Sequence, residues 1–267
     1  MGSGIIGALS YTFSDTFWFS AVEAEVYATS SLMTAMVFWA ILKWENEADK
    51  AYANRWLILI AYIMGLSIGV HLLNLLAIPA IVFVYYFRKY EFSWKGFFYA
   101  LLLSFVILAL IMWGLMPGFV ILASRMELFL VNKLGLPYHS GLFLLLILFT
   151  VSIILAIRYS LDGANKQRIL ASAFAAVLFS GIWLMAESLM INILLLGVLA
   201  YMVWRLSGRG VAALNTVLTM MMVIMIGYSS FATIYIRSNA NPPMDENNPE
   251  NIFSLLYYIN SCLLYTS

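Results

Sequence analysis

The apolar stretches of this chain are too long and too poor in charge for a water-soluble protein. Residues 56–87 contain no Asp, Glu, Lys or Arg, and residues 169–204 contain a single carboxylate, Glu187. Only 10% of the 267 residues are charged and 64% are hydrophobic, whereas about a quarter of a soluble domain is charged. The runs are continuous rather than alternating, which favours helices over a β-barrel. The sequence therefore predicts an all-α fold, a polytopic bundle of transmembrane helices.

We expect about eight spans after a short opening segment. A helix over all of residues 56–87 would be ~48 Å long, against a hydrocarbon core of ~30 Å. That stretch is therefore expected to break near "GVHLLN" into two helices, and residues 169–204 are expected to form a hairpin that turns near Glu187. The predicted spans cover residues 25–44, 56–70, 75–87, 96–116, 142–157, 169–186, 189–204 and 213–234.

The basic residues sort onto one side of this layout. If Glu23 and Glu25 lie outside and the spans alternate, only Arg125, Lys133 and Arg237 of the 14 basic residues lie in outer loops, which leaves eleven inside. This asymmetry is what the positive-inside rule requires. The eleven are Lys43, Lys50, Arg55, Arg88, Lys89, Lys95, Arg158, Lys166, Arg168, Arg205 and Arg209.

Most of the chemically versatile residues fall on the predicted outer side. Glu23 and Glu25 precede the first full span, and His71 and Asn74 lie at the turn of the first split hairpin. The two glutamates could instead reflect only the preference of acidic residues for a helix N-terminus. His71 and Asn74 could instead serve only to hydrogen-bond backbone groups at the helix break. On a regular helix the i, i+2 glutamates would diverge by about 200°, so they are not expected to face one ligand together.

Two further candidates lie on the same side. Glu187 sits at the turn of the second hairpin, where it is either functional or placed among lipid headgroups. Residues 117–141 form an amphipathic loop that is expected to lie along the membrane interface, with Arg125, Glu127 and Lys133 toward water. No HExxH or CxxC motif occurs, and the single cysteine, Cys262, carries no disulfide or metal prediction.

Three strings resemble a family of bacterial membrane proteins. "FSDTFWFSAVEAEVYATSSL", "GLSIGVHLLNLLAIPAI" and "IRSNANPPMDENNPENIFSLLYYIN" are similar to the DUF2723 family, common in Bacteroidetes and related to the protein O-mannosyltransferases. The similarity runs from about residue 3 to 260. It implies a glycosyltransferase of GT-C architecture in the bacterial inner membrane, with its site facing the periplasm. The implied donor is a polyprenyl-phosphate sugar, and the implied acceptor is a secreted protein or an envelope glycan.

The resemblance also assigns roles to individual residues. Glu23 and Glu25 match the second acidic element of the family, His71 and Asn74 match the "GVHLLN" stretch, and Arg237 matches the stretch after the last span. These residues, with Glu187 and Arg125, are the predicted catalytic (Glu23, Glu25) and substrate-binding set. No metal ligand and no cofactor is implied beyond the lipid-linked sugar itself.

One family element is missing. Family members carry an upstream helix and an outer loop with an Asp and a Glu, the expected primary base. We therefore expect residues 1–234 to be a transmembrane domain incomplete at its N-terminus, and this fragment to be inactive by itself. Residues 235–260 are expected to begin an extracytoplasmic segment. Residues 261–267, ending in "CLLYTS", are expected to be read-through of a sequencing adapter.

The chemistry gives a rationale beside the resemblance. Inverting transfer of a sugar from a phosphate needs a carboxylate to deprotonate the acceptor, and donors or cations for the leaving phosphate. The outer carboxylates, His71 and the arginines are suited to those tasks. Split hairpins with a nearby charge are also typical of transporters or lipid flippases, which is the alternative function. A second alternative is a non-catalytic scaffold in an envelope complex.

Overall fold

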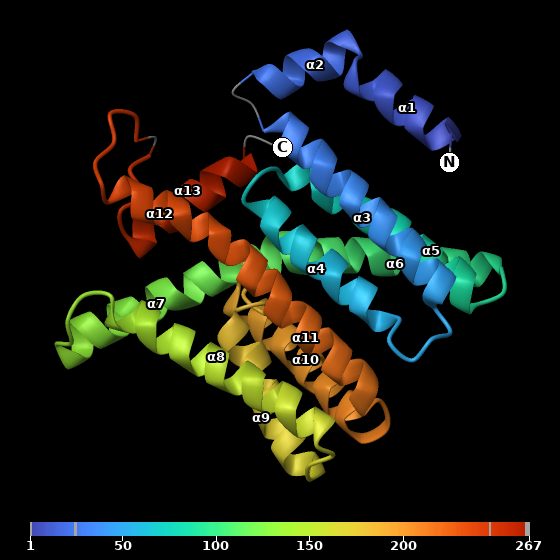
Figure 1. Ribbon diagram of the computed structural model, residues 1–267. Helices are drawn as coiled ribbons and strands as arrows, with labels where there is room; N and C mark the ends of the chain where they lie inside the picture. Colours follow the sequence, from blue (N-terminus) through green and yellow to red (C-terminus); the bar gives the residue numbers. More distant parts are fainter. Residues whose placement is uncertain (1, 24–25, 246, 265–267) are drawn as a thin grey trace.

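Helices are the only regular secondary structure in the described part of the chain. The computed structural model describes residues 2–23, 26–245 and 247–264, and no β-strand occurs among them. The all-α prediction is confirmed (Figure 1). The elements are α1 (Gly2–Thr12), α2 (Asp15–Val22), α3 (Tyr27–Glu47), α4 (Asn54–Ile68), η1 (Leu72–Ala77), α5 (Ile78–Lys89), α6 (Trp94–Ala109), η2 (Leu110–Leu115), α7 (Met116–Leu134), α8 (Ser140–Leu161), α9 (Lys166–Ser180), α10 (Leu189–Arg209), α11 (Val211–Tyr228), η3 (Ser229–Phe231), α12 (Ala232–Ser238) and α13 (Ile252–Leu264).

The described helices identify a membrane protein. Five continuous helical segments are long and apolar enough to cross a bilayer, and a sixth is added if α2 and α3 form one bent span. The eight predicted spans included α4 and α9, which have only 15 residues each and a rise of ~22 Å, less than the ~30 Å core. The five segments are Leu72–Lys89, Trp94–Leu134, Ser140–Leu161, Leu189–Arg209 and Val211–Ser238.

Both predicted hairpins are present. Helix α4 ends at Ile68, and the chain restarts in the 3₁₀ turn η1, where the His71 side chain accepts the Leu73 N–H. The break therefore falls at "GVHLLN", as predicted. In the second hairpin α9 already ends at Ser180, before the predicted residue 186, because Gly181 adopts a left-handed backbone conformation (φ 73°) that stops the helix.

The amphipathic stretch over residues 117–141, predicted to lie along the membrane interface, is helical as far as Leu134, and its position relative to the membrane stays a prediction. Residues 94–134 form a single 41-residue helical segment, α6–η2–α7, in which Pro117 stands at the first turn of α7. Proline has no backbone N–H to donate, and it follows directly after the π-helical turn η2 (Leu110–Leu115), where the helical hydrogen-bond pattern changes. Arg125 and Lys133 are exposed as expected, but Glu127 is only 1% exposed, so the expectation that Glu127 faces water is wrong.

Two hydrophobic cores are built side by side. The first core is formed by α3, α4, η1, α5 and η2, with Trp44, Ile41 and Leu75 almost fully buried. The second core is formed by α7, α8, α9, α11 and α13, around Leu145 and Ile153. The α6–η2–α7 segment passes from one core to the other. Helix α11 packs closely on α4, where a Cβ at Gly227 would lie 2.7 Å from the Gly65 carbonyl carbon.

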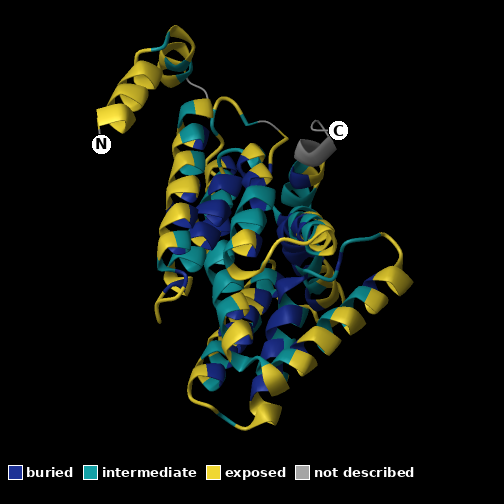
Figure 2. Ribbon diagram, turned by 90° about the vertical axis from the view of Figure 1, so that its right-hand side faces the viewer, coloured by how far each residue is buried: buried dark blue, intermediate teal, exposed yellow. Residues whose placement is uncertain are grey.

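The first two helices lie at the edge of the molecule. Neither α1 nor α2 has a buried residue, and Figure 2 shows them as a largely exposed pair beside the N-terminus, outside the bundle. The loops α3–α4, α5–α6, α8–α9 and α10–α11 gather at the lower right of Figure 1. The eleven basic residues assigned to the inner side lie in these loops or near the ends of the helices that the loops connect.

The α3–α4 loop is held to the end of α5 by charges. Lys89 Nζ donates to the Ala48 carbonyl at 2.8 Å, Arg88 Nε donates to the Glu45 carbonyl at 3.1 Å, and both side chains pair with Asp49. The cations therefore donate to carbonyls at the C-terminal end of α3, where the helix leaves carbonyl oxygens with weak or no helical partners. Hydrogen bonds from Arg88 and then Lys89 hold the pKa of Asp49 below its ordinary value of 3.8.

This lowered pKa predicts an acid-dependent effect. The contribution of Asp49 to stability is present above its unfolded-state pKa and is lost as pH falls through the folded-state pKa. We expect Asp49→Asn to lower the thermal unfolding midpoint in detergent slightly at pH 7, because exposed pairs contribute little. The difference from wild type should decrease as the pH falls from 7 through the folded-state pKa, which lies below 3.8, and it should shrink in high salt. A deficit that stays equal across this acid titration would assign the effect to something other than the ion pairs.

Candidate functional site

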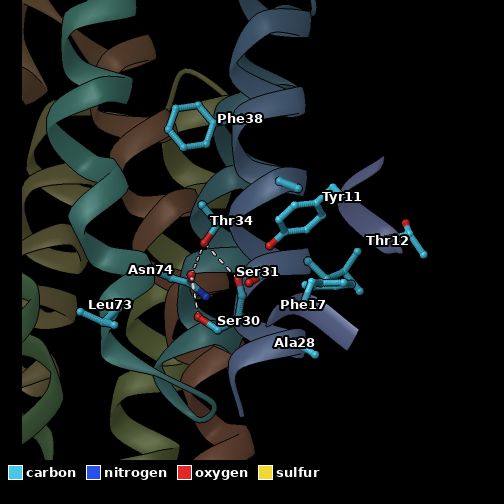
Figure 3. Close-up of a pocket in the computed structure, with 12 residues that line it drawn as sticks. Tyr11, Thr12, Phe17, Ala28, Ser30, Ser31, Thr34, Phe38, Leu73 and Asn74 are labelled. Atoms are coloured by element: carbon cyan, nitrogen blue, oxygen red, sulfur yellow. Dashed lines mark hydrogen bonds between the residues drawn. The ribbon is translucent and has the colours of Figure 1, made fainter. Parts of the chain in front are cut away.

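A cavity lies between the first three helices and the turn of the first hairpin. Its volume is about 540 Å³, within the usual range for ligand sites. Figure 3 shows Tyr11 and Phe17 on one side, α3 in the middle and Asn74 on the other side. The lining residues are Tyr11, Thr12, Phe17, Ala28, Ser30, Ser31, Leu32, Thr34, Ala35, Phe38, Leu73 and Asn74.

Asn74 is the most unusual of these residues. It is 2% exposed, and its Oδ1 accepts hydrogen bonds from Ser30 Oγ, at 3.1 Å, and from Thr34 Oγ1. Its Nδ2 has no hydrogen-bond partner. Both hydroxyls lie on one side of the amide, so turning the amide over would only exchange which polar atom is left without a partner. A buried amide that lacks one partner costs roughly 1–3 kcal/mol.

Local sequence explains this arrangement. Ser30 and Thr34 are four residues apart on α3 and so share one face of the helix, the face that packs on η1. The first split hairpin places Asn74 opposite them, because η1 begins directly after the break at His71. An uninterrupted helix over residues 56–87 would not bring Asn74 to this position.

His71 defines the outer edge of the break. Its Nδ1 accepts the Leu73 N–H at 3.1 Å, so the neutral ring carries its proton on Nε2, a hydrogen-bond donor. The ring lies 5.6 Å from that of Tyr27, measured between centroids. His71 thus combines a backbone role with a second ring nitrogen, Nε2, that makes no hydrogen bond to another described residue.

The polar groups of the cavity wall can hydrogen-bond the oxygen atoms of a ligand. Its polar groups are hydroxyls and one amide, which hydrogen-bond sugar hydroxyls or phosphate oxygens. None of the lining residues is charged. Within residues 2–23, 26–245 and 247–264, no group of three or more His, Cys, Asp or Glu side chains is placed to hold a metal ion.

The other predicted site residues lie elsewhere. Glu23 follows the last residue of α2 and is exposed, while Glu25 lies outside the described residues. Arg237 is exposed in the last turn of α12, Arg125 is exposed on α7, and Glu187 is exposed in the α9–α10 turn. None of these four described side chains lines the cavity. Of the predicted set, the structure therefore brings only Asn74 into the cavity wall, with His71 beside it.

Sequence reasoning missed two features of this region. Ser30 and Thr34 were not singled out, although two hydroxyl residues at i, i+4 within an apolar span are a recognisable signal. The contribution of Tyr11 and Phe17, whose rings lie 4.4 Å apart, depends on how α1 and α2 fold back beside α3. No sequence pattern predicts the contact of α1 and α2 with α3.

A second polar cluster joins α7 to α8. The carboxylate of buried Glu127 accepts the N–H groups of His139 and, at 2.7 Å, of Gly141. It thereby caps the N-terminus of α8 from the neighbouring helix. Tyr235 Oη lies 3.3 Å from His139 Nδ1 and ties α12 to the same point. Burial, followed by the Glu127 charge, raises the pKa of Tyr138 in the α7–α8 loop.

A comparison with known protein families gives a match for the segment that lines the cavity. Residues 1–94 match the family model for the protein O-mannosyl-transferase TMEM260 N-terminal domain. No curated protein and no solved structure matches the chain. All of the cavity-lining residues, from Tyr11 to Asn74, fall inside the matched segment. The first third of this membrane protein is thus similar to the N-terminal domain of a protein O-mannosyltransferase.

Proposed function

We propose that this chain belongs to a membrane glycosyltransferase of the O-mannosyltransferase type. The observation that carries the proposal is the match of residues 1–94 to an O-mannosyltransferase N-terminal domain. The proposed reaction is transfer of a sugar, mannose or a similar one, from a polyprenyl-phosphate donor to an extracytoplasmic protein or envelope glycan. The finer assignment is a DUF2723-type enzyme of GT-C architecture in a bacterial inner membrane, with its site toward the periplasm.

The cavity supports this function through Asn74. A donor with a phosphate and several hydroxyls offers oxygen acceptors for the unpartnered Nδ2. Hydrogen bonds from a fixed donor to an anionic oxygen are stronger than those between neutral groups. Because Ser30 and Thr34 already hold the Asn74 carbonyl, the amide is oriented before the ligand arrives, which reduces the entropic cost of binding.

The acid–base chemistry is assigned to the neighbouring acidic element. Transfer breaks the bond between the sugar anomeric carbon and the phosphate oxygen and forms one to the acceptor oxygen, whose proton passes to a carboxylate. In this proposal Glu23 or Glu25 orients the acceptor or supports that base. His71, through Nε2–H, and Arg237 contact the leaving phosphate, with Glu187 and Arg125 as further substrate contacts.

Substitution of Asn74 tests the cavity. Asn74→Asp keeps oxygen acceptors for Ser30 and Thr34 but replaces the free N–H donors with a negative charge. We expect this variant to bind a radiolabelled polyprenyl-phosphate mannose about 10- to 100-fold more weakly in nanodiscs, since a hydrogen bond to a charged group contributes roughly 1.5–3 kcal/mol. Where the chain is supplied with the upstream acidic loop that the family resemblance implies, transfer to a Ser/Thr-rich acceptor peptide should fall in parallel.

The matched control is Asn46→Ala. Asn46 is exposed on the same helix as Ser30, and its amide only bonds its own helix backbone, so donor binding should be unchanged. Unaltered binding in Asn74→Asp would remove the cavity from the proposal. Movement of the lipid across liposomes without sugar transfer would favour a transporter instead.

A further inference from the structure

An apolar groove runs between α8 and α9, away from the cavity. Its volume is about 510 Å³. The α8 wall presents positions spaced along one helical face, among them Ile147 and Val151, which are more than half exposed. The α9 wall presents small residues, Ala171 and Ala175, which leave room between the two helices. The groove is therefore open to the bilayer.

The hydroxyl groups in the groove are not available to a polar ligand. Ser152 Oγ donates to the Phe149 carbonyl at 2.9 Å, and Ser172 Oγ donates to the Arg168 carbonyl at 2.7 Å. Each hydroxyl thus satisfies its own helix backbone. The walls present methyl and methylene groups over most of their length, which suits a hydrocarbon chain.

One end of the groove is cationic. Tyr159 and Arg168 line it where α8 and α9 meet the short connecting loop. The other two cations of that loop are engaged, because Arg158 pairs with Asp162 at 3.5 Å and Lys166 lies 5.2 Å from the centroid of the Trp204 ring. Among the described residues no carboxylate forms an ion pair with Arg168.

We propose that this groove binds an anionic phospholipid, with an acyl chain between α8 and α9 and the headgroup phosphate on Arg168. The α8–α9 loop lies at the same end of the bundle as the other basic loops (Figure 1), so the lipid belongs to the leaflet on the predicted cytoplasmic side. Basic pockets between transmembrane helices on that side are suited to anionic headgroups. A phospholipid without net charge would also fill the groove. Its phosphate could pair with Arg168, but its headgroup would bring no net negative charge to that end of the groove.

The test is retention of phosphatidylglycerol by the purified protein. The protein is reconstituted in phosphatidylcholine nanodiscs with increasing phosphatidylglycerol, and bound lipid is counted by native mass spectrometry after release. We expect Arg168→Gln to weaken phosphatidylglycerol retention about fivefold, the effect of one basic residue at the membrane surface. Ala171→Trp should abolish it by filling the groove, since Ala171 is exposed and its replacement leaves the core intact.

Two controls locate the site. Arg209→Gln removes an inner-side cation outside the groove, and Ala212→Trp adds an indole at an exposed position of α11; both should retain the lipid as wild type does. A photoactivatable acyl chain should label groove residues such as Val151. Equal loss in Arg168→Gln and Arg209→Gln, or retention in Ala171→Trp, would overturn the proposal.

Discussion

Replacing Gly181 with alanine should destabilise the protein by about 2–5 kcal/mol. A non-glycine residue in the left-handed conformation costs roughly 1–2 kcal/mol, and overpacking of a tight contact costs roughly 1–3 kcal/mol more. Gly181 has φ 73°, and a Cβ there would meet the Gly118 carbonyl oxygen and lie 2.7 Å from Phe119 N. Neither neighbour is the flexible end of a side chain, so the α9–α10 turn must move away from α7.

Thermal unfolding in detergent, followed by intrinsic fluorescence, measures this effect. Gly197→Ala is the matched control, because Gly197 lies within α10 and nothing would touch its Cβ. Alanine should be neutral or slightly stabilising there, since it is the better helix former by roughly 1 kcal/mol. If the two variants melted together, the close approach of the α9–α10 turn to α7 would be contradicted.

Replacing Glu127 with alanine should have a comparable effect, about 3–6 kcal/mol. Its carboxylate accepts two backbone N–H groups at the start of α8, and a hydrogen bond to a charged group contributes roughly 1.5–3 kcal/mol. Removal leaves these N–H groups without an acceptor and opens a gap between α7 and α8. We expect a large fall in the unfolding midpoint, with increased hydrogen exchange confined first to residues 135–145.

Two further variants separate charge from hydrogen bonding. Glu127→Gln keeps one carbonyl acceptor but presents an N–H₂ to the second backbone donor. The fall in its unfolding midpoint should therefore be intermediate between wild type and Glu127→Ala, or larger. Glu91→Ala is the control, because Glu91 is exposed in the α5–α6 loop and its removal should leave the midpoint unchanged. A Glu127→Ala protein that unfolds at the wild-type temperature would show that the α8 N-terminus is capped by other groups.

The sequence predicted the parts of the fold that depend on length and hydropathy. Residues 56–87 were expected to break because a helix of that length exceeds the bilayer, and the break lies at His71 as expected. The clustering of basic loops followed from the same layout. These are one-dimensional arguments, and they succeed because the membrane limits the chain to a few arrangements.

Tertiary packing determines the features that the sequence patterns did not predict. Pro117 followed by a run with Arg125, Glu127 and Lys133 suggested a surface segment, but the proline fits a helix first turn and Glu127 is buried as a cap for α8. Sequence offers no sign that a carboxylate will be used by a helix that begins twelve or more residues later. Asn74 was predicted from its place at the break, but its partners Ser30 and Thr34 lie about forty positions away.

The π-helical turn η2 has a mechanical consequence for the whole molecule. It lies where the 41-residue segment leaves the first core, at Ile111 and Met116, and enters the second, at Phe119. The segment is ~60 Å long, about twice the hydrocarbon thickness, so it must cross the membrane obliquely or bend. A continuous helical segment that packs into a separate hydrophobic core at each end can transmit a rotation of one core to the other. We therefore expect a change in bilayer thickness to alter the slope of this segment and, through the first core, the position of η1, which carries Asn74.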